Sequence, residues 1–318
     1  METSAGLTLH PQRPIEHFAM TQSSEPASSL KAIDSLAVDV LTDDVSDTYA
    51  SKTLFAVSEF ANVIAAGAKV ISGEALLCAN LGIRLGEVEC IAVSHGHWDH
   101  MAALPATIDA IVAEGGKVAI HVNPGMFNER AIKLASGTIV PVAKVSSPCE
   151  MEARGAKVVN QSGARLLLDG HFYYSGEIPR LSSFEKGRTD HLSRVGEGAP
   201  WEPDPLLMDE RMLVAHVRDL GLIVFSACSH AGIVNVCTHV RALFPDIPIH
   251  CVMGGLHLGG VMERIIPQTV EGLRPFAIRN IITAHCTGWR ALHALANAFG
   301  DAVSQSAVGT RYTFAPGY

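Results

Sequence analysis

The sequence lacks any run of about 18 or more apolar residues, so no transmembrane helix is expected. It also lacks a charged N-terminal region followed by an apolar stretch, which argues against a secretory signal. The seven cysteines form no CxxC pair, and their odd number does not suit a disulfide framework. We therefore expect a protein of a reducing compartment, the cytoplasm.

Clusters of basic residues are also missing. The chain has 24 Lys and Arg against 32 Asp and Glu, a formal net charge of −8, and its basic residues are scattered. Nucleic acids and anionic membranes bind basic patches, so neither is expected as a partner. A small-molecule substrate is the expected partner, and a homodimer remains open. With 318 residues, 48% of them hydrophobic, the chain can bury a sizeable core.

The chain divides into a leader and one folded domain. Residues 1–34 are rich in Ser, Thr and Pro and predict a disordered leader, whereas 35–318 predict a single domain. In that domain short strands come first, and strands then alternate with helices. Residues 181–207 are polar and rich in Gly and Pro, which predicts a long surface loop. The pattern favours an α/β (α+β) fold layered as helix, sheet, sheet and helix.

The strongest chemical signal is the segment His95-Gly96-His97-Trp98-Asp99-His100, which follows the apolar run Glu89–Val93. Imidazole and carboxylate groups are ligands of zinc and similar divalent metals. A loop directly after a buried strand can direct His95 and His97 to one ion, while Asp99 and His100 face a second. A chance histidine-rich turn is the alternative, and the preceding strand disfavours it.

Three later histidines, His230, His257 and His285, each follow an apolar strand. A single histidine in such a place is more often a hydrogen-bonded core or surface residue. Three in the same context favour His230 and His285 as further metal ligands, because functional residues gather on loops at strand ends. For His257 two roles remain open: it either supports the metal ligands through hydrogen bonds or contacts the substrate.

The other motifs also have ordinary structural interpretations. Ser175–Arg180 (SGEIPR) reads as an ordinary turn, or Arg180 binds a substrate phosphate or carboxylate through its planar guanidinium. Asp209-Glu210-Arg211, taken alone, reads as the solvated entry to a hairpin. Cys286 is either a reactive thiol or a small packing residue.

The order of these motifs resembles the metallo-β-lactamase superfamily, whose signature is HxHxDH after a strand. The segments SGEIPR, DER at 209–211, ACSHAGIVN at 227–235, MGGLHL at 253–258 and HCTGWRA at 285–291 resemble one branch of it. That branch contains dihydropterin-methyl-ribofuranosylaminobenzene-phosphate synthase of the methanopterin pathway. The resemblance covers about residues 35–314.

The resemblance implies an αββα sandwich with a dinuclear site at one edge, holding Zn²⁺ or alternatively Mn²⁺ or Fe²⁺. The implied metal ligands are His95, His97, Asp99, His100, His230 and His285. A metal-activated hydroxide would be the nucleophile, and Asp99 would be the catalytic residue that orients it. Substrate contacts or support behind the ligands would come from His257, Arg180, Glu177 and Cys286. The expected function is that of a metal-dependent hydrolase or related transferase acting on a small anionic substrate.

The sequence departs from the family pattern in two places. Many members carry an Asp that bridges both metals after a later strand, whereas Gly221–Ser226 leads here to Ala227-Cys228, so Cys228 or Glu177 would have to compensate. Ala61–Ile71 runs almost directly into Ser72–Leu77, so part of an N-terminal β-hairpin is expected to be missing. These departures keep open a non-catalytic or inactive homologue that binds a metal or ligand.

Overall fold

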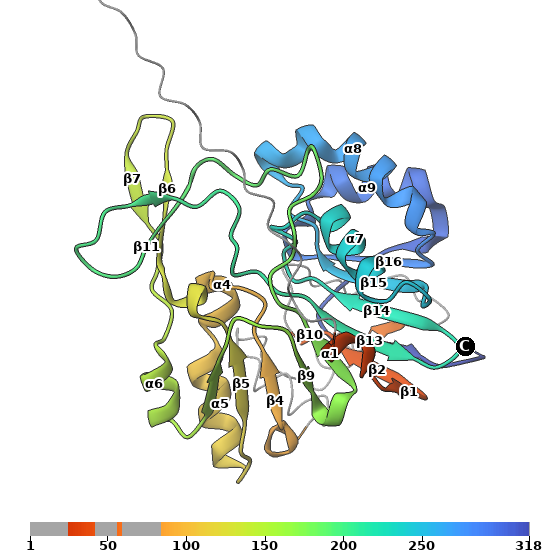
Figure 1. Ribbon diagram of the computed structural model, residues 1–318, viewed down its shortest axis with the longest axis horizontal. Coiled ribbons are helices and arrows are strands. Elements are labelled where there is room, and N and C mark those ends of the chain that lie inside the picture. Colours follow the sequence, from red (N-terminus) through yellow and green to blue (C-terminus); the bar gives the residue numbers. More distant parts are fainter. Residues whose placement is uncertain (1–24, 42–55, 59–83, 318) are drawn as a thin grey trace, which may run out of the picture.

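The computed structural model describes residues 25–41, 56–58 and 84–317, and a mixed sheet dominates the C-terminal half of this part (Figure 1). Along the sheet the strand order is β17-β16-β15-β14-β13-β10-β9, and β1 pairs with the far end of β13. The strands are β1 Ala32–Ile33, β9 Arg165–Leu167, β10 Phe172–Tyr174, β13 Leu213–Val217, β14 Gly221–Phe225, β15 Ile249–Gly255, β16 Asn280–Ala284 and β17 Val303–Gln305. Because β14, β15, β16 and β17 run parallel, their carboxyl ends meet at one edge of the sheet.

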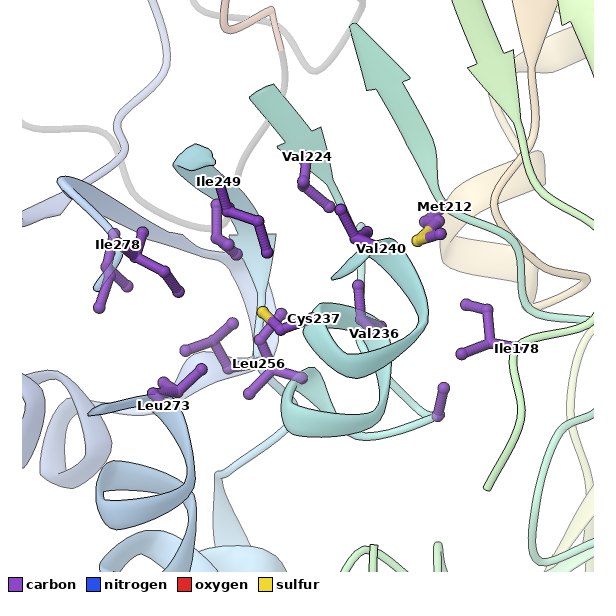
Figure 2. Close-up of a cluster of buried hydrophobic side chains, with 14 of the residues drawn as sticks. Ile178, Met212, Val224, Val236, Cys237, Val240, Ile249, Leu256, Leu273 and Ile278 are labelled. Atoms are coloured by element: carbon purple, nitrogen blue, oxygen red, sulfur yellow. The ribbon is translucent and has the colours of Figure 1, made fainter. Parts of the chain in front are cut away.

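Helices α7 (Ile233–Leu243), α8 (Ile266–Leu273) and α9 (Trp289–Phe299) cover one face of this sheet (Figure 1). In α7 the buried residues Val236, Cys237 and Val240 recur at helical spacing and form one apolar stripe. Figure 2 shows this stripe packed against Val224 of β14 and Ile249 of β15. Apolar packing thus holds α7 against β14, the strand whose following loop leads into α7.

A second, smaller sheet packs on the other face. It consists of β2 (Leu36–Asp39), β18 (Thr310–Phe314) and β3 (Ala56–Ser58), with β18 in the middle. Tyr312 and Phe314 of β18 contact a cluster that includes Ile223 and Ile282 of the large sheet. Covering on both faces explains why β14 reads as the unbroken apolar run GLIVF rather than as an alternating strand.

The N-terminal half contributes a third, parallel sheet of β4 (Cys90–Ala92), β5 (Ala119–Val122) and β8 (Lys157–Asn160). Helices α5 (Leu104–Ala113) and α6 (Pro148–Ala153) flank this sheet, and their buried residues join its apolar cluster (Figure 1). The short helix α4 (Trp98–Met101) follows β4. Helices therefore lie outside and sheets inside, which confirms the predicted αββα layering.

A fourth sheet, of β6 (Glu129–Lys133), β7 (Ile139–Pro141), β11 (His191–Arg194) and β12 (Glu202–Pro203), stands beside these layers (Figure 1). The described residues also include the short helix α1 (Glu25–Ser28). Short 3-10 turns occur at Leu85–Glu87, Pro124–Phe127, Leu168–Gly170, Gly260–Ile265, Arg274–Phe276, His285–Thr287 and Gly300–Ala302.

The predicted disordered leader, 1–34, differs from the structure over its last part. Residues 25–33 contain α1 and β1, Ala27 is buried, and β1 pairs with His216 and Val217 of β13. Strand β10 pairs only with residues 213–215 of β13, so β1 satisfies backbone groups that β10 leaves open. Residues 1–24 lie outside the described part of the chain.

Two further expectations concern loops. The predicted surface loop 181–207 contains β11 and β12, and it buries Glu185 and His191, so it is not wholly a surface segment. The expected loss of an N-terminal hairpin rests on residues 61–77, which lie outside the described residues.

None of the described helices has the length and apolar character needed to cross a membrane.

The two-sided burial of β14 gives a stability prediction. Leu222 and Ile223 are adjacent and fully buried, one facing the helices and the other facing β18. Leu222→Ala and Ile223→Ala should each lower the free energy of unfolding by about 2–5 kcal/mol, measured by urea denaturation. Val195→Ala, at a residue that is 88% exposed, is the control and should change it by less than about 0.5 kcal/mol. A small effect at either buried position would contradict the packing on that face.

Candidate metal centre

The loop from Ser94 to His97 directs two imidazole rings at each other. Nε2 of His95 lies 3.0 Å from Nδ1 of His97, and Nδ1 of His95 lies 3.0 Å from the hydroxyl of Ser94. His97 is the N-cap residue of α4, so the chain turns into a helix immediately after it. Gly96 allows the turn, because a Cβ there would lie 2.1 Å from the carbonyl oxygen of Met126.

His230 joins His95 and His97 to form a group of three imidazoles. One ligand nitrogen from each residue lies within 4.8 Å of the others, and the ring centroids are 4.6 to 4.7 Å apart. Burial lowers the pKa of His95 and His230 well below the usual range and that of His97 to about 2. All three rings are therefore neutral near pH 7 and present lone pairs, the form in which histidine binds metals.

The donor set fits a metal ion. Nε2 of His230 is buried and has no hydrogen-bond partner among the described residues. Leaving a buried polar nitrogen without a partner is unfavourable, and a cation held between the three rings would satisfy it. Three nitrogen donors are also the protein contribution typical of a catalytic zinc site.

Asp99, His100 and His285 form a second group beside the first. Oδ2 of Asp99 lies 3.4 Å from Nε2 of His285 and 3.7 Å from Nε2 of His100. Burial raises the pKa of Asp99, but the bond to His285 and the nearby His100 outweigh it and bring this pKa to about 2. The ring centroids of His95 and His100 are 4.3 Å apart, so the two groups adjoin.

Two cysteine thiols adjoin His100. Sγ of Cys228 is 3.1 Å from Nε2 of His100 and 3.4 Å from Sγ of Cys286. Burial raises the pKa of Cys228, whereas the bond between the two thiols favours the thiolate on Cys286 and lowers its pKa to about 5. Cys228, Cys286 and His257 offer ligand atoms within 4.8 Å of one another, and Cys228 does the same with His95 and His100.

Three neighbouring parallel strands, β14, β15 and β16, bring the C-terminal site residues to the centre. Cys228 and His230 follow β14, His257 follows β15, and His285 follows β16. Ser229, His257 and His285 adopt positive φ angles of 54°, 47° and 43°. Such angles are unfavourable for residues other than glycine and are found where surrounding contacts enforce them, often at functional sites.

Asp209, Glu210 and Arg211 connect the two histidine loops. The Asp209 carboxylate accepts a hydrogen bond from Gly96 N (2.8 Å) and pairs with Arg130 (2.7 Å). The Glu210 carboxylate accepts from the backbone nitrogens of His230 (2.7 Å) and Ala231 (2.6 Å). The backbone nitrogen of Arg211 donates to the carbonyl oxygen of Ser94 (2.7 Å). All three residues are buried, so the interpretation of this segment as a solvated hairpin entry is wrong.

Two predicted supporting residues lie elsewhere. The Arg180 guanidinium donates to the carbonyl oxygens of Ile178, Leu206 and Leu207. These bonds brace the chain before Asp209, whereas the buried Nε of Arg180 has no hydrogen-bond partner among the described residues. Glu177 is exposed and belongs to none of the converging groups described above. His257 and Cys286, by contrast, are brought to the centre.

A cavity of about 130 Å³ opens next to the centre, lined by residues that include His97, Trp98, Asp99, Arg130 and His191. The side chain of Trp98 is half-exposed. The His191 ring lies 5.6 Å from that of His97, and its Nδ1 is buried with no partner in the described part of the chain. His191 and Arg130 were not predicted from the sequence, since neither lies in a motif or after an apolar strand.

No protein-family model matches the chain. Among curated proteins, it is similar to the 7,8-dihydropterin-6-methyl-4-(β-D-ribofuranosyl)-aminobenzene-5′-phosphate synthase of Methanocaldococcus jannaschii, with 28% identity over 228 residues, 70% of this chain and 74% of that protein. An uncharacterised protein of the same organism is 25% identical over 205 residues, 64% of this chain and 71% of the relative.

Among solved structures, the chain is similar to Tm1679, described as a metal-dependent hydrolase of the β-lactamase superfamily. The TM-score is 0.64 at 20% identity, with 86% of this chain and 97% of that chain covered. This likeness shows the fold. Together with the similarity to the synthase, it confirms the resemblance that the motifs predict.

The Asp209 bond to the histidine loop gives a second prediction. Asp209→Asn should weaken zinc binding about 10- to 100-fold, because the amide no longer holds Gly96 and Arg130 with a full charge. Affinity would be measured by competition with a chromophoric chelator. Asp204→Asn is the matched control, since Asp204 pairs with the same Arg130 guanidinium (2.9 Å) and not with Gly96. An equal loss in both variants would show that only the charge of Arg130 matters.

The buried His191 predicts a pH dependence of the metal-free protein. Burial lowers its pKa from 6.5 to about 4, so between these values the unfolded chain binds a proton that the folded chain does not. The contribution to stability is therefore complete above pH 6.5 and is lost as the pH falls towards 4, up to about 3 kcal/mol. His191→Gln should reduce the slope of the pH profile of urea unfolding in this window by about one proton, while the remaining slope comes from other buried histidines such as His95, His97 and His230. Val195→Ala, at an exposed residue without a titratable group, is the control and should leave the profile unchanged.

Proposed function

Because the chain has the metallo-β-lactamase fold, we propose that it is a metal-dependent hydrolase or related transferase that acts on a small anionic molecule. One observation carries the proposal: His95, His97 and His230 converge beside Asp99, His100 and His285. The similarity to a synthase whose name specifies a phosphorylated pterin compound supports a pterin- or phosphate-bearing substrate.

The residues divide between two ion positions. His95, His97 and His230 would hold one ion, and Asp99, His100 and His285 a second. Nitrogen and carboxylate donors suit Zn²⁺, with Mn²⁺ or Fe²⁺ as the alternatives. When bound, such ions supply Lewis acidity, which polarises a substrate oxygen and makes water more acidic.

The protein's own groups position the reactants. The Asp99 carboxylate is charged near pH 7 and lines the cavity, where it can accept a hydrogen bond from a water and orient it towards the substrate. His191 is neutral at that pH and can donate a hydrogen bond to a substrate oxygen. The half-exposed ring of Trp98 offers a flat apolar face at the cavity wall, which suits a planar ring system.

The proposal is tested by metal analysis and reconstitution. The purified protein should contain at least about one equivalent of Zn, Mn or Fe per chain, and a chelator should abolish turnover that the added metal restores. The assay would cover phosphodiesters, esters, lactones and phosphorylated pterins. Less than about half an equivalent of metal, with no activation on reconstitution, would refute the proposal.

His97→Ala should remove metal from the three-histidine group and reduce turnover to background, because only two of its nitrogen donors remain. Metal content and initial rates measure the effect. His293→Ala is the matched control at an exposed histidine of α9 and should keep both. If the wild type took up metal stoichiometrically without turning over any of these substrates, the non-catalytic alternative would replace the enzyme.

A further inference from the structure

Two thiols and one imidazole next to the histidine centre are not used by the function proposed above. Cys228, His257 and Cys286 come from the loops after β14, β15 and β16, and their ligand atoms all lie within 4.8 Å of one another. Both cysteines are free thiols, with 3.4 Å between their sulfur atoms. Such a set of two sulfurs and one nitrogen is a recognised donor combination for zinc.

The spacing of these groups suits a shared ion. Zinc–sulfur bonds of about 2.3 Å and zinc–nitrogen bonds of about 2.0–2.1 Å place tetrahedral donors roughly 3.5–3.8 Å apart. The sulfur atoms, at 3.4 Å, therefore need to move by only a few tenths of an ångström. The fourth position of the tetrahedron would be open.

The imidazole of His257 is buried beside the Cys286 thiol. Both of its ring nitrogens are buried and neither makes a well-formed hydrogen bond among the described residues, although the ring lies close enough to the Cys286 thiol to favour its thiolate form and lower its pKa. Its backbone is held at a φ of 47°, which is unfavourable for a histidine and implies that the position is imposed by its surroundings. A cation at the thiols would give this ring a ligand role.

The neighbouring backbone leaves room for the Cys286 sulfur. Gly255 stands beside it, and a Cβ at that position would lie 2.8 Å from the sulfur and 2.5 Å from the carbonyl oxygen of Ala227. Glycine is therefore required for the thiol to occupy this place.

We propose that Cys228, Cys286 and His257 form a thiolate site for a soft or borderline divalent cation, adjoining the histidine centre. Binding displaces one proton from each thiol to solvent, so that two thiolates and a neutral imidazole hold the cation. Cys228 lies 3.1 Å from Nε2 of His100, so its negative charge would stand between this cation and the ions of the histidine centre. That charge would reduce the repulsion between neighbouring cations.

The test uses the full chain, stripped of metal, kept reduced with a phosphine and titrated with Cd²⁺ alone. Cadmium bound to thiolates gives an ultraviolet charge-transfer band whose intensity follows the number of sulfur ligands. The wild type should show a two-thiolate band that saturates near one equivalent. Cys286→Ser should halve it, and Cys228→Ser with Cys286→Ser should abolish it. Cys237→Ser, at a buried cysteine of α7, is the matched control and should leave the band unchanged.

The outcomes also separate this site from the proposed catalytic centre. His97→Ala should leave the band intact while removing turnover, and His257→Ala should weaken Cd²⁺ binding about 10-fold or more while keeping both sulfurs. A one-thiolate band that Cys286→Ser does not change would assign Cys228 to His95 and His100 and overturn the proposal. A band that appears only with a large excess of Cd²⁺, or no band at all, would also overturn it. Circular dichroism and urea unfolding would confirm that each variant is folded.

Discussion

The buried charges of Asp209, Glu210 and Arg211 are the contacts on which the candidate centre depends. A carboxylate inside a protein needs partners, and each of these two finds them in a loop that carries histidines. Asp209 holds the backbone of Gly96 between His95 and His97, while Glu210 holds the backbone of His230. The same three residues lead into β13, so the position of both loops is fixed relative to the central sheet.

That support matters because the histidine group leaves a buried nitrogen unsatisfied in the metal-free protein. Burial keeps the three-imidazole group uncharged, and Nε2 of His230 is left without a partner among the described residues. Positive φ angles at Ser229 and His285 add local backbone strain. Arrangements of this kind persist only when the rest of the fold over-determines them, and they are typical of sites shaped for binding rather than for stability.

The sequence predicts the metal motif and the later histidines for a definite physical reason. His230 and His285 follow apolar runs that form neighbouring parallel strands, and such strands end at one edge of a sheet. Asp209, Arg130 and His191 escape prediction because their roles depend on distant partners. The Asp209 bond to Gly96 spans 113 residues, and local charge alone made its segment look solvated. The polar composition of residues 181–207 predicted a surface loop for the same reason, since composition does not reveal that β11 pairs with β6.

The place of Cys228 shows how one substitution bears on the whole centre. The resemblance to the superfamily implies a carboxylate where the chain leaves this strand, and a carboxylate favours hard ions. A thiolate there favours softer ions. Because the sulfur lies within 4.8 Å of donor atoms of both His95 and His100, and also of those of His257 and Cys286, ions bound on either side would not be independent. If ions bind there, the metal preference of one position would depend on what occupies the next, because Cys228 offers its sulfur to both groups of donors.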